Sequence, residues 1–306
     1  MGVLATIAAI AVSGAAGVAA ERRWPDRAVS WARSALVASL YTLVPFVTFF
    51  NLARIELDAN LGGGILLGWV AILAAAGLAW LVGDRVLHLP RASTGALIVC
   101  TLVPNSGYLG YPLTASLLGF DSLGEAVVYD IVVVAPSLLL LAFSAGAAFG
   151  ERAGEGPRER TVAFFTRNPP LYAAIAALLA PDTLAPDLLV DASRVAVIAL
   201  LPIGFFAVGA VLTEEEQGGV RLGLPLGTPA VAAIVLRVAI APGLLFLLSA
   251  PLIDLPDPYL LLATMPCGIN TLLVAHVYGL DARLSAQAVA WSTAVVVAAA
   301  LLAQGL

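Results

Sequence analysis

The chain has little charge and few side chains that titrate near neutral pH. Only 11% of its 306 residues are charged, whereas soluble proteins carry about 25%. Lysine is absent, and His88 and His276 are the only histidines. No polar stretch is long enough for a separate soluble domain. With 61% hydrophobic residues and a mean hydropathy of +0.99, the sequence predicts an all-α membrane protein with many spans through the lipid bilayer.

Residues for the common catalytic and metal-binding motifs are also scarce. The two histidines do not form an HExxH sequence, and there is no GxSxG sequence for a serine nucleophile. A Walker A sequence is absent, so ATP-driven pumping is not encoded. Cys100 and Cys267 fall in expected spans, which favours a packing role over a disulfide. We therefore expect no enzyme activity, cofactor, metal site or nucleic-acid partner.

Apolar runs recur along the chain at about the 20-residue length that crosses a bilayer as a helix. Ten spans are expected, of which the sixth is short, and a nine-span alternative would omit it. The expected spans are residues 2–20, 29–51, 62–83, 92–119, 122–148, 168–181, 192–211, 228–250, 257–278 and 282–304.

The positions of the arginines favour ten spans and predict their orientation. Cytoplasmic segments of membrane proteins are enriched in arginine and lysine. With the N-terminus outside, twelve arginines lie in or beside cytoplasmic segments, and only Arg54 and Arg194 lie near the outside. A nine-span chain would place Arg221 and Arg283 outside and weaken this bias. We therefore expect both termini outside a plasma or inner membrane.

The two halves of the chain repeat one pattern of prolines and helix ends. Five spans per half is an odd number, so the second half must enter the membrane from the opposite side. Such a 5+5 inverted repeat is typical of secondary transporters. We expect repeats at 1–150 and 168–306, joined by a short cytoplasmic loop at 151–167. Three pairs carry the pattern: Pro45 and Pro202, 157 residues apart; Pro104 and Pro266, 162 apart; and Gly119 and Gly279, 160 apart.

Proline, glycine and asparagine interrupt the fourth and ninth spans near the middle of the membrane. Main-chain groups exposed by such a break are costly in lipid unless protein or a wet cavity receives them. Broken helices that enter from opposite sides can cross, with their half-helix N-termini directed at one site. A kink packed against its neighbours is the alternative for either break alone. The expected substrate site comprises Pro104, Asn105, Ser106, Gly107, Pro266, Gly268, Asn270 and Thr271.

Two charged residues lie well inside expected spans, Asp130 in VVYDIVV and Arg237 in IVLRVAI. A charge at that depth costs about 2.5–3.5 kcal/mol on insertion scales and usually faces a partner or a cavity. One hypothesis is a structural pair between them. In another, Arg237 attracts an anionic substrate while Asp130 exchanges a proton, and in a third Asp130 is a capping residue. His276 is either a proton-exchanging residue or a hydrogen-bonded packing residue.

Three stretches of the sequence resemble one transporter family. LVPNSGYLGYPLTASLLG, which begins at Leu102, resembles the crossover motif of the auxin efflux carrier (PIN-type) family, within the bile-acid-symporter-like superfamily of ten-span transporters. MPCGINTLLVAHVYGLDARLSAQAVAWST resembles the ninth span of that family and the start of its tenth, and RNPPLYAAIAALL resembles its sixth. The short middle loop is similar to that of prokaryotic members.

The resemblance implies a scaffold domain of spans 1, 2, 6 and 7 and a transport domain of spans 3–5 and 8–10. It also implies a homodimer and an elevator-like motion of the transport domain. Asn105 and Asn270 match the positions that face substrate in the family. They differ in register, because Asn105 directly follows Pro104 whereas Asn270 lies four residues after Pro266.

We therefore expect a secondary carrier for a small organic anion, a carboxylate or auxin-like acid. The negative charge of the substrate follows from the half-helix N-termini, and the auxin-like or dicarboxylate identity follows from the resemblance alone. A sodium-coupled carrier like the bile-acid symporters, a channel, and a receptor or sensor on the same fold are the alternatives.

Labelling of introduced cysteines in intact cells tests the predicted orientation. On a background in which Cys100 and Cys267 are replaced, an impermeant thiol reagent should label a cysteine at Leu184 and spare one at Glu155. The reason is that the arginine bias places 151–167 in the cytoplasm. Labelling at Glu155 without labelling at Leu184 would contradict the orientation.

Overall fold

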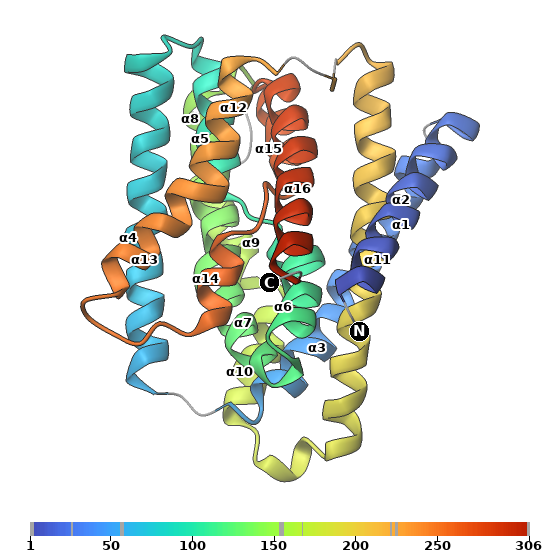
Figure 1. Cartoon of the computed structure of the whole chain (residues 1–306), viewed down its shortest axis with the longest axis vertical. Coiled ribbons are helices and arrows are strands. Elements are labelled where there is room, and N and C mark those ends of the chain that lie inside the picture. Colours follow the sequence, from blue (N-terminus) through green and yellow to red (C-terminus); the bar gives the residue numbers. More distant parts are fainter. Residues whose placement is uncertain are drawn as a thin grey trace.

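The computed structural model describes residues 3–25, 27–55, 58–152, 156–166, 168–220, 222–223 and 226–304. These residues are helical except for turns, loops and one isolated bridge between two extended residues. Seven helical stretches among them are long and apolar enough to cross a membrane. Most of the long helices run along the long axis of the molecule (Figure 1).

The described residues of the first half of the chain form eight α-helices. The second bilayer-length stretch is divided at Thr42, and Pro45 lies in the first turn of its second part, where proline is tolerated. π-helical turns extend or join the α-helices in several stretches: η1 (Val82–Val86), η2 (Ser106–Gly110), η4 (Asp130–Val134) and η5 (Ser137–Ala142). The α-helices are α1 (Val3–Arg23), α2 (Arg27–Tyr41), α3 (Leu43–Leu52), α4 (Ala59–Leu81), α5 (Arg91–Leu102), α6 (Tyr111–Leu117), α7 (Leu123–Tyr129) and α8 (Phe143–Phe149).

In the second half, the part of the chain that the structure describes also forms eight α-helices. Pro202 lies inside a continuous 31-residue helix, α11, and so differs in context from Pro45. One π-helical turn, η7 (Leu236–Ile240), connects two α-helices. The α-helices are α9 (Pro157–Thr166), α10 (Pro169–Leu179), α11 (Asp187–Gln217), α12 (Thr228–Val235), α13 (Ala241–Ser249), α14 (Asp257–Ala263), α15 (Asn270–Tyr278) and α16 (Ala282–Gln304).

Three of the ten expected spans are not long continuous helices. The fourth and ninth are interrupted, as their prolines predict, and both end at a glycine with positive φ, Gly119 at 94° and Gly279 at 69°. The sixth is the 11-residue helix α10, which Asn168 caps by accepting a hydrogen bond from Leu171 N at 3.3 Å. The segment expected as a cytoplasmic loop contains α9. The structure thus supports seven helical stretches of bilayer length, and the ten-span inverted repeat stays a prediction.

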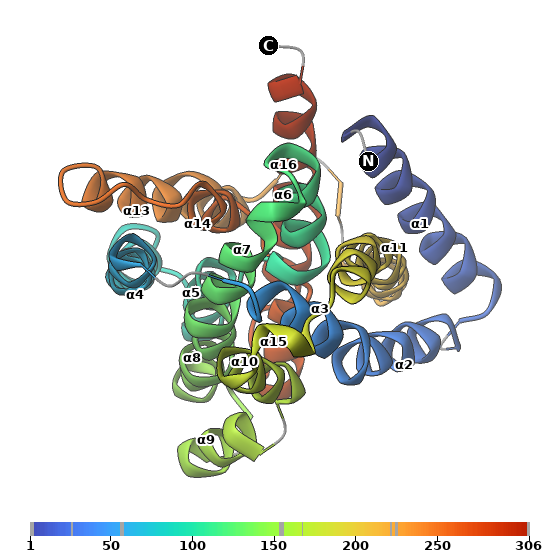
Figure 2. The same cartoon turned by 90° about the horizontal axis from the view of Figure 1, so that it is seen from below.

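The helices form two groups. The first bundle comprises α1, α2, α3, α10 and α11, in which α1 runs along α11 and α3 packs against α10. The second bundle comprises α4–α8 and α12–α16, in which α5 packs against α4 and α8, and α16 packs against α12 and α15. Seen from below, α1, α2 and α11 lie on one side and α4, α13 and α14 on the other (Figure 2). The first bundle contains the spans that the resemblance assigns to a scaffold.

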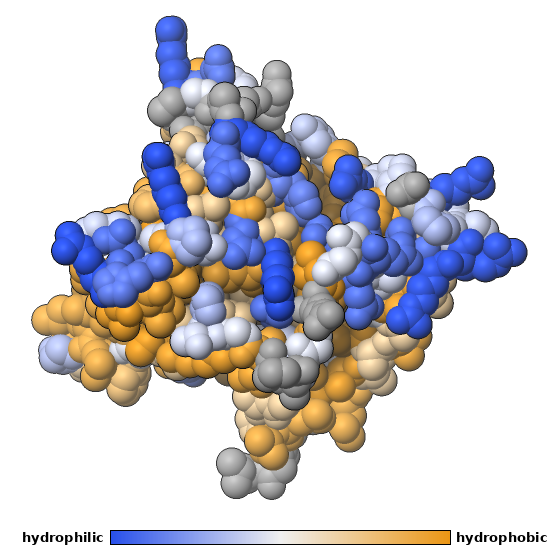
Figure 3. Space-filling view, turned by 90° about the horizontal axis from the view of Figure 1, so that it is seen from above, coloured by the Kyte–Doolittle hydropathy of each residue, from blue (hydrophilic) through white to orange (hydrophobic). Residues whose placement is uncertain are grey.

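One end of the molecule is markedly polar. Figure 3 shows hydrophilic side chains gathered over this end, with apolar side chains on the flanks. The turn between α4 and α5 lies here (Figure 1), and it carries the exposed Arg85 and Arg91. α5, which begins at this turn, is buried throughout from Thr94 to Leu102. A helix buried on all sides packs against protein rather than facing lipid.

Glycines allow α1 and α11 to approach closely. A Cβ on Gly17 would lie 2.2 Å from Phe206 O, and a Cβ on Gly209 would lie 2.2 Å from Gly14 O. Both obstacles are main-chain atoms, which cannot rotate away as a side chain can. Small residues at such contacts let helix backbones pack tightly in membranes, where the hydrophobic effect provides no driving force.

Alanine at Gly209 should therefore destabilise the protein, because α1 and α11 must move apart. We expect a lower melting temperature, corresponding to about 1–3 kcal/mol of overpacking. Gly77 in α4 is the matched control, since a Cβ there would meet no atom within 4 Å. Gly77→Ala should leave the melting temperature unchanged or raise it slightly. Equal melting temperatures for the two variants would contradict the close contact.

Candidate functional site

The two interrupted helices meet at their breaks. Pro104, after α5, and Cys267, after α14, pair as an isolated antiparallel bridge. A Cβ on the neighbouring Gly268 would lie only 3.0 Å from Pro104 O, so glycine suits this close approach. Two main-chain hydrogen bonds of 2.8 Å flank the bridge, from Asn105 N to Pro266 O and from Gly268 N to Val103 O. We call residues 103–107 and 264–271 the crossover.

The last carbonyls of α5 all have donors. Four carbonyls at the C-terminus of an α-helix lack the usual partner four residues ahead. In lipid each carbonyl without a donor would be costly. At the end of α5, the helix itself supplies one donor and three other segments supply the rest. Val99 O accepts from Val103 N at 3.2 Å, Cys100 O from Cys267 Sγ at 3.4 Å, Thr101 O from Arg237 Nη1 at 2.7 Å, and Leu102 O from Ser137 Oγ at 3.1 Å.

The carbonyls at the C-terminal end of α14 also accept hydrogen bonds. Thr264 N donates to Leu260 O at 3.0 Å and to Leu261 O at 3.1 Å. Ala263 O accepts from Arg237 Nη2, so one guanidinium contacts the final turns of both α5 and α14. Beyond the bridge, Cys267 N donates to Ser292 Oγ of α16 at 2.9 Å. The predicted cost of breaking two helices is thus offset by donors from the same bundle.

Arg237 and Asp130 have separate partners. Among the ion pairs formed by the described residues, none joins the two side chains. Asp130 instead accepts hydrogen bonds from Ser106 Oγ and, at 2.7 Å, from Tyr111 OH. Asp130 therefore lies beside the second half of the broken fourth span, next to a predicted substrate residue.

The two predicted asparagines stand at the starts of the second half-helices. Asn105 is the residue before η2, and Asn270 is the first residue of α15. Asn105 is 6% exposed and Asn270 is half-buried. Neither amide side chain has a hydrogen-bond partner among the described residues. Beside Gly107 there is open space, because a Cβ there would meet no atom within 4 Å. Ser106, Gly268 and Thr271 are buried around them.

The crossover lies against the first bundle. A Cβ on Gly204 of α11 would be 2.4 Å from Tyr108 Cβ, so Tyr108 occupies the space that glycine leaves on this helix. The Tyr108 hydroxyl lies 3.3 Å from Ser39 Oγ of α2. The second half of the broken fourth span therefore touches both α2 and α11.

The chain is similar to a curated transporter. Over 221 residues it is 25% identical to the protein described as "Uncharacterized transporter MJ1031" from Methanocaldococcus jannaschii, covering 69% of this chain and 68% of that protein. No protein-family model matches the chain. The similarity and the long apolar helices together support a multi-pass membrane transporter.

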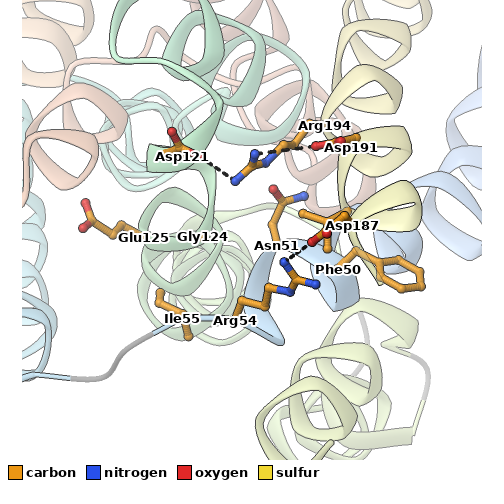
Figure 4. A pocket seen from close by; sticks show the side chains of 11 residues that line it. Phe50, Asn51, Arg54, Ile55, Asp121, Gly124, Glu125, Asp187, Asp191 and Arg194 are labelled. Carbon is orange, nitrogen blue, oxygen red and sulfur yellow. Dashed lines mark hydrogen bonds and ion pairs between the residues drawn. The ribbon is translucent and has the colours of Figure 1, made fainter. Parts of the chain in front are cut away.

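A second polar region of this transporter was not predicted. A cavity of about 520 Å³ lies between the end of α3, the start of α7 and the start of α11 (Figure 4). Arg194 of α11 contacts Asp121 at 2.6 Å across it, and Arg54 contacts Asp187 at 2.6 Å. None of the predicted substrate residues lines this cavity. Its charged residues come from separate helix ends, so no local pattern marks them in the sequence.

His276 joins the two bundles. Its Nε2 lies 2.9 Å from Oε1 of Glu215, a buried residue of α11, and its Nδ1 lies 2.8 Å from Leu272 O. Both ring nitrogens thus face oxygen atoms, and the tautomer sets which nitrogen donates. His276 was predicted as a proton-exchange candidate, whereas Glu215 was not predicted as its partner.

Proposed function

We propose that the protein is a secondary carrier that moves a small organic anion, a carboxylate or auxin-like acid, with its substrate site at the crossover. The observation that carries the proposal is the pair of asparagine amides at the starts of two half-helices, neither with a hydrogen-bond partner among the described residues, together with the open space at Gly107. Discontinuous helices that present their N-termini to a shared site are how secondary transporters bind anionic groups. The similarity to a curated transporter supports the same class.

The charges around the crossover favour an anion. The starts of η2 and α15 each present the positive end of a helix dipole, a partial charge of about half an electron. In α15 the N–H groups of Thr271 and Leu272 donate to Gly268 O and Ile269 O. The opposing carbonyl ends of α5 and α14 are occupied by donors, and Arg237 adds a full positive charge to them. The amide N–H₂ groups of Asn105 and Asn270 offer further donors. A carboxylate at this position would find donors from both half-helices.

Asp130 is the opposing charge. Its carboxylate lies next to Ser106, and an ionised Asp130 would repel an anion bound at the same residues. In our proposal a proton on Asp130 therefore accompanies substrate binding, and the acid is the coupling residue. Ser106 and Tyr111 can retain hydrogen bonds to either protonation state, because hydroxyls both donate and accept.

The two bundles suit an elevator mechanism, in which the second bundle carries the crossover past the first. The first bundle then acts as the scaffold, and in the homodimer that the resemblance implies it also forms the contact between subunits. Three contacts between the bundles would have to exchange during this motion: Tyr108 with Gly204, Arg194 with Asp121, and His276 with Glu215.

Substrate affinity of asparagine variants tests the site. The ligand is first chosen by a thermal-shift screen of carboxylates, since a ligand of the folded state raises its stability. Asn105→Ala should remove charge-assisted hydrogen bonds of about 1.5–3 kcal/mol each, a loss of affinity of roughly ten- to hundredfold per bond. Asn270→Ala should act in the same direction, with little change in melting temperature for either variant.

Asn51→Ala is the matched control for this test. Asn51 Nδ2 donates to Val47 O at 2.8 Å and to Ser193 Oγ at 3.1 Å, so its loss should lower the melting temperature and spare affinity. Unchanged affinity in both Asn105→Ala and Asn270→Ala would reject the crossover site. Substrate counterflow in proteoliposomes separates a carrier from a receptor, because only a carrier exchanges ligand across the membrane.

The pH dependence of binding tests the role of Asp130. Protonation removes the repelling charge, so anion affinity of the unmodified protein should fall as pH rises over a range in which the ligand stays ionised. Asp130→Asn should bind tightly at every pH in that range. Besides Tyr111, which donates to Asp130, the titratable residues on helices packed against η4 are Tyr108, Glu125, Tyr129 and Tyr172.

Glu125→Gln is the control for this experiment, because tyrosines ordinarily titrate near pH 10 and Glu125 is the remaining acid. Glu125→Gln should retain the pH dependence of the unmodified protein. If the pH dependence survives in Asp130→Asn and disappears in Glu125→Gln, the coupling residue is Glu125. That result would reject the role proposed for Asp130.

A further inference from the structure

Arg237 occupies an unusual position for a buried charge. It lies on η7, is 2% exposed, and directs its guanidinium at main-chain carbonyls rather than at a carboxylate. Among the ion pairs of the described residues, none includes Arg237. Its two acceptors, Thr101 O and Ala263 O, belong to the final turns of α5 and α14. Two helix C-termini therefore stabilise one cation.

Carbonyls of this kind are ligands for inorganic cations in other carriers. Exposed carbonyls at half-helix C-termini and in unwound segments coordinate sodium in secondary transporters with broken helices. In this chain a side chain that is always charged donates to both carbonyls. The guanidinium also reaches two acceptors in different segments at once, because its N–H groups are spread over a planar fork.

We propose that Arg237 is a tethered cation at the crossover, which fills a latent site for a monovalent cation between Thr101 O and Ala263 O and makes the carrier independent of sodium there. This role rests on the proposed function and deepens it, because it names the cation that balances the crossover. Arg237, Thr101 and Ala263 all belong to the second bundle, so the charge travels with the site through the cycle. A dissociable ion would have to bind and leave in each cycle, whereas Arg237 remains in place.

Removal of the tethered guanidinium should have two consequences. Arg237→Ala leaves both carbonyls buried without a donor, which destabilises the folded state. It also vacates space for a small cation beside those carbonyls. A soluble guanidinium derivative or sodium should then bind there and restore stability, whereas choline is too bulky and has no N–H group.

The test measures melting temperatures of the purified full chain without substrate, in sodium chloride and in choline chloride of equal ionic strength. For the unmodified protein the two salts should give the same value. Arg237→Ala should melt at a lower temperature in choline, and sodium or ethylguanidinium at a non-denaturing concentration should raise it. Arg85→Ala is the control, because Arg85 is exposed and its ion pair among the described residues is with the adjacent Asp84 at 3.0 Å; it should show neither effect.

Three results would overturn the inference. These are an Arg237→Ala protein as stable as the unmodified one, a destabilised variant that neither sodium nor ethylguanidinium rescues relative to choline, and a sodium-specific stabilisation of the unmodified protein. If Arg237→Ala does not fold, the melting temperatures of Arg237→Lys and Arg237→Met are compared instead. Lysine retains a cation and should melt above methionine, and equal melting temperatures would reject a role for the charge.

This test is independent of the substrate site. It reads stability without ligand, so unchanged ligand affinity in the Asn105 and Asn270 variants would reject the proposed site and leave the Arg237 result standing. Conversely, failure of cation rescue would leave the role of the asparagines untouched.

Discussion

The main chain at the crossover must be hydrogen-bonded although it is not helical, and the rest of the structure is arranged around that requirement. The two breaks provide hydrogen bonds to each other, because Asn105 N and Gly268 N each donate to a carbonyl of the opposite segment. The remaining carbonyls take donors from η5, from η7 and from the loop that precedes α15. Since water is absent from the bilayer core, the breaks persist only with these partners in place.

The same requirement distributes charge. The Arg237 guanidinium donates to the carbonyl ends of α5 and α14, whereas Asn105 and Asn270 stand at the N-terminal ends of η2 and α15. Asp130 then lies on the side of these N-termini, through Ser106 and Tyr111, rather than on the side of Arg237. Positive and negative side chains thus serve opposite ends of the broken helices, which is why they do not pair with each other.

The contacts between the bundles differ in kind from the contacts within them. Within the first bundle, α1 and α11 meet through glycines against main-chain atoms, a tight and rigid arrangement. Between the bundles, polar pairs lie near the two ends of α11, Arg194 with Asp121 and Glu215 with His276. Partly exposed ion pairs contribute little stability. Such pairs can exchange at small cost, whereas the packed glycine contact cannot.

The sequence by itself determined the environment and the local geometry. Composition predicts the membrane, and proline with glycine predicts where the fourth and ninth spans break, because those residues restrict or free the backbone of their own segment. Gly119 and Gly279, matched from sequence alone, both have the positive φ that ends a helix. The asparagines stand at the starts of half-helices, a position that depends only on the break beside them, whereas their contact with substrate stays a prediction.

Only the tertiary structure decided which distant groups meet. Arg237 donates to carbonyls 136 and 26 residues away, and Glu215 contacts His276. These contacts form because helices far apart in the sequence pack side by side. The cavity between α3, α7 and α11 arises in the same way. The sixth expected span is only the short α10, and α9 occupies an expected loop, since helix length depends on packing as much as on apolarity. Each residue type sets the backbone preference of its own segment, whereas contacts across the molecule depend on how all the helices pack together.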